Sequence, residues 1–131
     1  MSPQSHNLAE VFAVLTPQLS VEPIDVSPSV FDELGSRFTG FKNHVLVSCF
    51  EFAADWPTWE RHPAGDEIVV LLSGKVTLLL RTAKGDTRIE LSQMGSFVIV
   101  PRDTWHTARA AEPTRMLFVT PGEGTENRAD L

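Results

Sequence analysis

The sequence predicts an all-β fold, an antiparallel sandwich or barrel of short strands. Between residues 44 and 120 it contains about eight short runs rich in β-branched, aliphatic and aromatic residues, with turn residues between them. No segment among these runs has the length and pattern of a helical crossover, so neighbouring strands are expected to pair antiparallel. At 131 residues the chain is long enough for one domain with a hydrophobic core and too short for two.

The expected strands are bounded by turn residues throughout. A hairpin turn is predicted at Ala83–Asp86, where a small residue, a lysine, a glycine and an aspartate follow one another. The strands are expected at residues 44–52, 58–62, 67–73, 76–81, 87–91, 95–100, 104–109 and 115–120.

Residues 1–42 differ in pattern from the strand region. Asn7 can cap a short helix that ends before Pro17, because the apolar residues there have helical spacing: Leu8, Val11, Phe12 and Leu15. Residues 16–28 contain three prolines and are expected to form an extended connector, and Ser29 can begin a second helix that stops at Gly35. We therefore expect a short helical N-terminal extension (1–42) within the same domain, the barrel (43–121) and a polar, solvated C-terminal tail (122–131).

Composition excludes several classes of function. The formal net charge is -6 and no basic stripe is present, which argues against a nucleic-acid partner. The longest apolar run, Ile68–Leu72, is far too short to span a bilayer, and no basic region followed by an apolar run marks a secretory signal. The single cysteine, Cys49, cannot form an internal disulfide, so we expect a cytoplasmic protein.

Four acidic and histidine residues form a candidate site. Glu60 and His62 are two apart on an expected strand, so they project from the same face. The turn at residues 63–66 brings Glu67, which opens the next strand, back toward the same space. A fourth donor has to come from a distant strand, and His106 is the candidate.

These positions resemble the two motifs of the cupin superfamily over residues 44–120. The first family motif has a His-x-His pair, a Glu, six residues and a Gly, which Glu67 and Gly74 match in spacing. The second has a Gly, five residues, a Pro and then a His, as Gly95, Pro101 and His106 do here. The resemblance implies a double-stranded β-helix, or jelly-roll barrel, with a divalent metal ion. By position the ligands would be Glu60, in place of the first histidine of the pair, with His62, Glu67 and His106.

The donor set leaves the metal open. Carboxylate and imidazole suit zinc, iron and manganese, and nickel is a further candidate. Two carboxylates would neutralise a divalent ion. Glu60 is either a ligand or a carboxylate beside the ligands. Without a metal ion, two clustered glutamates would repel and the pKa of one would rise, which could itself create an acid–base site.

The resemblance implies a metal-dependent enzyme that acts on a small oxygenated molecule, of the dioxygenase, isomerase, cyclase or lyase type. Glu60 and Glu67 are the candidate catalytic residues, since either could move a proton. The alternative is a non-catalytic protein that binds a small sugar or organic acid. Fold alone does not decide between them.

We also expect a homodimer. By alternation Trp59 and Trp105 face away from the ligand side, and Val70 and Leu72 have the parity opposite to Glu67. Large exposed apolar patches are uncommon on monomers, and two-fold pairing is the commonest way to bury them. The competing explanation is that the apolar face of the N-terminal segment covers one sheet within the monomer.

Overall fold

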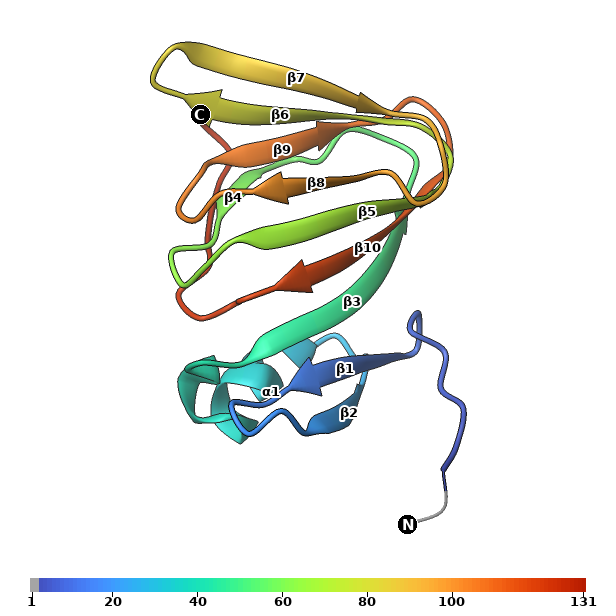
Figure 1. Cartoon of the computed structure of the whole chain (residues 1–131), viewed down its shortest axis with the longest axis vertical. Coiled ribbons are helices and arrows are strands. Elements are labelled where there is room, and N and C mark those ends of the chain that lie inside the picture. The colour runs from blue at the N-terminus through green and yellow to red at the C-terminus, as the bar shows by residue number, and fades with distance from the viewer. Residues whose placement is uncertain (1–2) are drawn as a thin grey trace.

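The computed structural model describes residues 3–131 and consists of two antiparallel sheets that face each other (Figure 1). The six-stranded sheet has the order β2-β1-β3-β10-β5-β8, and the five-stranded sheet has the order β11-β4-β9-β6-β7. The sheets do not close into a continuous barrel. The predicted all-β jelly-roll architecture is confirmed.

All eight expected strands are present, with ends within two residues of the expected ones. They are β3 (Val45–Phe52), β4 (Trp59–Arg61), β5 (Glu67–Ser73), β6 (Val76–Thr82), β7 (Gly85–Leu91), β8 (Phe97–Val100), β9 (His106–Arg109) and β10 (Thr114–Thr120). Three further strands are β1 (Val11–Leu15), β2 (Val21–Asp25) and β11 (Glu126–Arg128). Among residues 3–131, no helix is long and apolar enough to cross a membrane.

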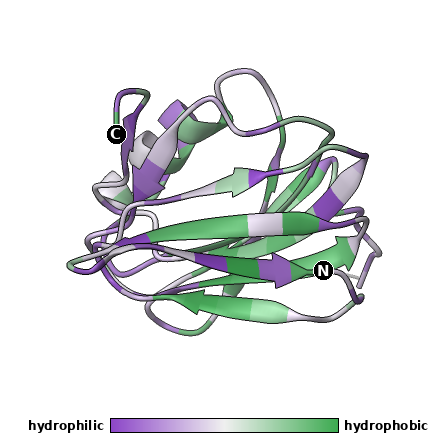
Figure 2. Cartoon of the chain, turned by 90° about the horizontal axis from the view of Figure 1, so that it is seen from above, coloured by the Kyte–Doolittle hydropathy of each residue, from purple (hydrophilic) through white to green (hydrophobic). Residues whose placement is uncertain are grey.

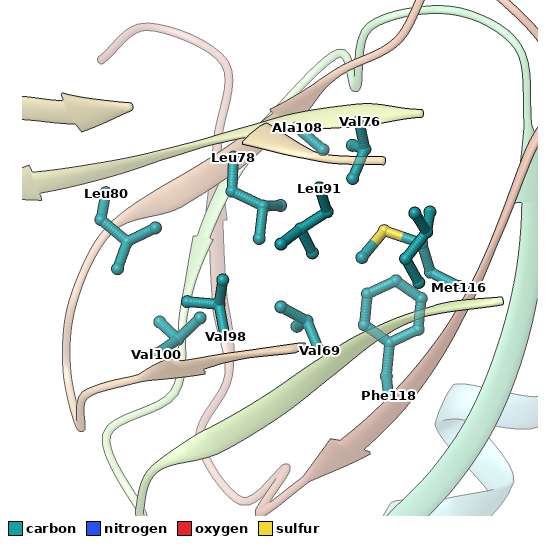
Figure 3. Packing of buried hydrophobic residues seen from close by; sticks show 11 residues of the cluster. Val69, Val76, Leu78, Leu80, Leu91, Val98, Val100, Ala108, Met116 and Phe118 are labelled. Carbon is teal, nitrogen blue, oxygen red and sulfur yellow. The ribbon is translucent and has the colours of Figure 1, made fainter. Parts of the chain in front are cut away.

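The main core lies between the two sheets, where inward side chains from both meet (Figure 3). Alternation along each strand produces it, because every second residue of β5 and β10 points inward. Figure 2 shows that the strands carry most of the hydrophobic residues, whereas the C-terminal strand is hydrophilic. The buried cluster comprises Val69, Leu71, Val76, Leu78, Leu80, Leu91, Val98, Val100, Ala108, Met116 and Phe118.

Gly74 makes the tight connection between β5 and β6 possible. Its φ of +85° lies in the left-handed region, and a Cβ at this position would lie 2.4 Å from the carbonyl oxygen of Pro113. The glycine of the first motif is thus required by both backbone conformation and space.

The helix predicted from Asn7 to Leu15 is wrong. Asn7 caps only a single turn, in which its Oδ1 accepts a hydrogen bond from the N–H of Ala9 at 2.9 Å. The chain then enters β1, which lies between β2 and β3 in the sheet. Phe12 and Val14 are buried on one face of β1, and this alternation outweighs the helical spacing because the sheet edge supplies backbone partners.

The segment predicted as a connector, residues 16–28, contains the strand β2. Its three prolines favoured a connector over a strand. Pro23 is tolerated because β2 is an edge strand with only β1 as its neighbour. The second predicted helix is present as α1 (Val30–Arg37), but its predicted stop at Gly35 is wrong, because the helix continues to Arg37 and the N–H of Phe38 still bonds to the carbonyl oxygen of Leu34. The 3₁₀ turn η1 (Thr39–Phe41) follows. Together α1, η1, β1 and β2 surround a second apolar cluster of Phe12, Val14, Ile24, Val30, Leu34, Phe38, Phe41 and Leu46.

The C-terminal tail is not simply a solvated end. Its residues 126–128 form β11, which pairs antiparallel with β4 through the register Asn127–Glu60. Arg61 secures this pairing, because its guanidinium forms two hydrogen bonds of 3.0 and 3.1 Å with the carboxylate of Glu126.

Candidate metal centre

The four predicted site residues converge from both sheets. Glu60 on β4 lies directly opposite His106, the first residue of β9. His62 follows β4 immediately, and the turn at residues 63–66 carries the chain into the other sheet, where Glu67 begins β5. One potential ligand atom from each lies within 4.8 Å of the other three. The convergence expected from the sequence is therefore present.

Their polar atoms surround a common point. His62 Nε2 lies 3.4 Å from Glu60 Oε1 and 3.2 Å from Glu67 Oε2. His106 Nε2 lies 3.5 Å from Glu60 Oε1 and 3.1 Å from Glu67 Oε1. Donor atoms that share an ion at about 2.1 Å lie about 3.0 Å apart at octahedral angles and about 3.4 Å apart at tetrahedral angles. The observed separations of 3.1 to 3.5 Å lie within that range or 0.1 Å beyond it.

Three of these atoms are buried without a hydrogen-bond partner among the described residues: His62 Nε2, His106 Nε2 and Glu67 Oε1. A buried polar atom that lacks a partner costs about 1–3 kcal/mol. Three such atoms directed at one point are typical of a set of metal ligands. Together with the carboxylate of Glu60 they fit a divalent cation.

The outer ring nitrogens orient both histidines. His106 Nδ1 lies 2.9 Å from the carbonyl oxygen of Thr104, which can only accept, so Nδ1 carries the proton. His62 Nδ1 lies 2.8 Å from Thr125 Oγ1, whose own proton is donated to the carbonyl oxygen of Gly122 at 2.9 Å. Thr125 therefore accepts from His62. In the neutral state both rings direct the lone pair of Nε2 into the site.

A threonine also orients the buried glutamate. Thr120 Oγ1 donates a hydrogen bond of 2.6 Å to Glu67 Oε2, and the side chain of Glu67 is only 2% exposed. This leaves Oε1 directed toward the site. Thr120 and Thr125 were not foreseen as site residues. Thr120 shares the inward parity of Met116 and Phe118, which was an available signal, whereas nothing near Thr125 in the sequence indicates its role.

The electrostatics of the four groups are strongly coupled. Burial alone raises the pKa of Glu60, but contact with His106 and His62 outweighs it and lowers that pKa to about 2. The pKa of Glu67 is also lowered, because contact with His106 and His62 outweighs the effect of burial. Burial lowers the histidine pKa values, but contact with Glu60 and Glu67 raises the pKa of His62 to about 9 and that of His106 to about 10. Without a metal ion the same contacts favour protonated histidines, so the four groups attract one another as ion pairs although Nε2 of each ring forms no hydrogen bond.

A cavity of about 710 Å³ leads to this cluster. Glu60, His62 and Glu67 line it, together with aromatic side chains from β3 and the segment before β4. The side chain of Glu60 is 25% exposed, whereas those of the other three cluster residues are 5% exposed or less. Glu60 is thus the member of the cluster that an incoming molecule meets first.

The two outward tryptophans are covered by arginines. The guanidinium of Arg81 lies 4.4 Å from the ring centre of Trp59, and that of Arg61 lies 4.8 Å from the ring centre of Trp105. Trp59 is only 7% exposed. The expectation that Trp59 offers an open apolar surface is therefore wrong.

Comparison with solved structures identifies the fold. The chain is similar to a cupin-2 domain protein from Shewanella frigidimarina (19% identity, 64% of this chain and 71% of that one, TM-score 0.49). It is also similar to hydroxypropylphosphonic acid epoxidase from S. wedmorenis (17% identity, 58% and 42%, TM-score 0.50). A variant of oxalate decarboxylase from Bacillus subtilis aligns at 18% identity over 65% of this chain and 23% of its own, with a TM-score of 0.51. No family model and no curated protein matches the sequence.

The alignments with TM-scores of 0.50 and 0.51 show the fold alone. The chain has the cupin fold, and the predicted resemblance to the cupin superfamily is confirmed at the level of fold. The Glu60–His62–Glu67–His106 cluster can bind a metal ion. The solved cupins differ from one another in chemistry, so the reaction has to be argued from the site.

Proposed function

We propose that this chain is a divalent-metal-dependent enzyme that acts on a small oxygenated molecule. The observation that carries the proposal is the set of three buried, unpartnered ligand atoms at the end of a large cavity. A purely structural core would not retain such atoms, because each one lowers stability. A bound divalent ion would supply Lewis acidity or an oxygen-binding centre.

The residues divide into two roles. His62, Glu67 and His106 would hold the ion, since all three are buried and each is oriented by a hydrogen bond from its outer side. Glu60 is the better placed of the two glutamates to move a proton, because it is partly exposed to the cavity while Glu67 is held by Thr120. Whether Glu60 is also a ligand is tested below.

Metal analysis of purified variants tests the proposal. After equilibration with Fe²⁺, Mn²⁺, Zn²⁺ or Ni²⁺, the wild-type chain should retain about one ion per site, and His106→Ala should retain almost none. The matched control is His44→Ala, since His44 lies outside the cluster with its Nδ1 2.7 Å from the carbonyl oxygen of Lys42. Equal metal content in wild type and His106→Ala would contradict the metal centre.

An activity screen on the loaded protein separates an enzyme from a binding protein. We expect consumption of oxygen, or conversion without oxygen, for at least one small oxygenated compound. A metal-loaded chain that binds such compounds and returns them unchanged would instead be the non-catalytic sugar- or acid-binding protein.

A cytoplasmic location remains our proposal, because Cys49 has no second cysteine in the chain.

We propose a homodimer formed through the outer face of the six-stranded sheet. Paired residues of successive strands form an apolar row across all six strands: Pro23, Ala13, Val47, Val119, Ile68 and Ile99. Beside it, Phe97 lies opposite Val70, and Phe97 and Ile99 are 58% and 56% exposed. Such a continuous apolar face is unusual on a monomer.

Light scattering tests the dimer. We expect a mass near twice 14.5 kDa for the wild type, and a return to the monomer mass for Ile99→Glu. Trp105→Glu is the control, because Trp105 directly precedes β9 of the other sheet and is covered by Arg61. A wild-type mass of 14.5 kDa across a range of salt would defeat the proposal, and dissociation by Trp105→Glu alone would move the interface to the other sheet.

A further inference from the structure

The cavity wall beside the metal centre is aromatic. Phe50, Phe52, Trp56 and Phe118 line it and contact one another, with ring centres 5.7 to 5.9 Å apart. Phe50 is 40% exposed although its strand parity is inward, because its ring faces the cavity and not the packed core. Phe31 of α1 lines the same cavity and is 61% exposed. Such exposed rings are suited to contact a flat apolar ligand.

The charge around the cavity favours an uncharged ligand. Among the described residues, no arginine or lysine lines it. Glu60 and Glu67 carry two negative charges, which a divalent ion would cancel. The remaining acidic residue, Glu51, is paired with Arg115 at 3.2 Å. An anionic group placed away from the metal would therefore have no counter-charge, and burying an unpaired charge is costly.

Ser48 is one of the polar residues that line the same cavity. Ser48 is 2% exposed and lines the cavity, and its hydroxyl forms no hydrogen bond within residues 3–131. On β3 it lies between the inward residues Leu46 and Phe50 and opposite Phe118. A hydroxyl that faces the cavity in this way can donate a hydrogen bond to a ligand atom or accept one from it.

We infer that the substrate class of this site is an uncharged aromatic molecule with two oxygen functions. One oxygen would be at the metal centre, the ring would lie against Phe50, Trp56 and Phe118, and the second oxygen would pair with Ser48. This inference rests on the proposed function, because the metal supplies the charge that balances Glu60 and Glu67. It excludes small anions such as dicarboxylates or phosphonates as the preferred ligands.

Calorimetry with Zn²⁺-loaded full-length chain tests the inference with three matched probes: 4-ethylphenol, 4-(hydroxymethyl)phenol and 4-hydroxybenzenesulfonate. The first two differ only in the second oxygen, and the third places a negative charge at the far end of the same phenol. We expect 4-(hydroxymethyl)phenol to bind about fivefold more tightly than 4-ethylphenol, and the sulfonate to bind at least about tenfold more weakly than either.

Variants locate the binding site. Phe50→Leu should weaken 4-ethylphenol binding about two- to tenfold, whereas Phe97→Leu, which changes an exposed ring on the outer sheet face, should leave it unchanged. Ser48→Ala should abolish the preference for the hydroxymethyl probe without weakening 4-ethylphenol. Because Phe50 and Ser48 are probed separately, misfolding of one variant leaves the other informative.

Zinc content of the same samples separates the two proposals. If the wild type holds no zinc, the proposed function fails. If it holds zinc but binds the sulfonate as tightly as 4-ethylphenol, or if Phe50→Leu and Phe97→Leu behave alike, the inference about the substrate is overturned while the metal centre stands.

Discussion

The two ends of the space between the sheets are built by the same strands and have opposite properties. Along β5 the inward residues pass from Glu67 to Val69 and Leu71, and along β10 they pass from Thr120 to Phe118 and Met116. One end is a close-packed aliphatic core, and the other is a cluster of four titratable groups beside a cavity. Alternation decides only which residues face inward, and their chemistry decides whether that space stabilises the fold or binds a ligand.

The two ends also differ in what they contribute to stability. The packed end gains stability from apolar burial. The polar end holds buried atoms that form ion pairs but no hydrogen bond, so it gains less from burial until a ligand pairs with them. Changes at the polar end should therefore act mainly on metal binding, and changes at the packed end mainly on unfolding.

The largest effect should come from pH, and it should fall on the polar end. With pKa values of about 9 and 10, His62 and His106 both carry a proton in the metal-free chain at neutral pH, and a metal ion must displace both. The association constant for Zn²⁺ should therefore rise about 100-fold per pH unit, or about 10⁴-fold from pH 6 to pH 8. Calorimetry in buffers of different ionisation enthalpy should show release of about two protons per ion.

The stability of the metal-free chain should change in the opposite direction. Because the folded pKa of each histidine is raised, its contribution is fully present below the unfolded pKa of about 6.5 and is lost as pH rises toward 9 or 10. The lowered pKa of Glu60 adds stability above about pH 4.5 that is lost as pH falls toward 2.

The result that would contradict the predicted pH dependence of zinc binding is an association constant that does not change between pH 6 and pH 8. It would show that the histidines are neutral in the metal-free chain.

At the packed end, Leu78→Ala should lower the free energy of unfolding by about 2–5 kcal/mol, because Leu78 is 1% exposed in the main core and its truncation leaves a cavity. Urea titration followed by far-UV circular dichroism measures the loss. Leu19→Ala is the control, since Leu19 is 80% exposed and should change stability by less than about 0.5 kcal/mol. Zinc bound per folded molecule should stay the same in both variants, and its loss in Leu78→Ala would link the two ends.

The core and the ligand set could be predicted because their signals are local. The run from Glu67 to Ser73 is almost continuously apolar, and its expected bounds match β5. Glu60 and His62 share a face by spacing alone. The helix predicted between Leu8 and Leu15 is wrong because the apolar residues there fit both a helix and a strand. Pairing of β1 with β3 makes the segment a strand.

The residues that orient the ligands could not be predicted, for a different physical reason. Thr125 approaches His62 only because β11 pairs with β4, a contact between segments about 65 residues apart. A three-residue polar strand carries too little pattern to be recognised in advance. Ser48 is similar, since a single serine on an apolar strand does not reveal that its hydroxyl faces a cavity.

Thr125→Val tests the orienting contact, and its effect should be smaller than that of pH or core truncation. Valine has nearly the same shape but cannot accept the hydrogen bond from His62 Nδ1. Zinc affinity should fall about 10- to 100-fold, as is typical when the partner of a ligating histidine is removed. Thr125→Ser, which keeps the hydroxyl, should restore most of it. A Thr125→Val variant with wild-type affinity would show that the ring of His62 is held by packing alone.

The smallest effect is expected at Glu60, the most exposed member of the cluster. It lies directly opposite His106 and borders the cavity, so a larger side chain can be accommodated there. Glu60→His should keep or tighten binding of Zn²⁺ and Ni²⁺, because imidazole suits these ions, and should weaken Mn²⁺, which prefers carboxylate oxygen. The expected changes in affinity are within about tenfold, since three ligands are retained.

Two further variants at the same position separate its roles. Glu60→Ala should weaken binding of all four ions if the carboxylate is a ligand, and unchanged stoichiometry and affinity would show that it is not. Glu60→Gln keeps an oxygen but lacks a basic carboxylate, so it should impair proton transfer during turnover more than metal binding. A variant that binds metal normally but turns over slowly would assign Glu60 to the chemistry of the polar end and leave His62, Glu67 and His106 as the groups that hold the ion.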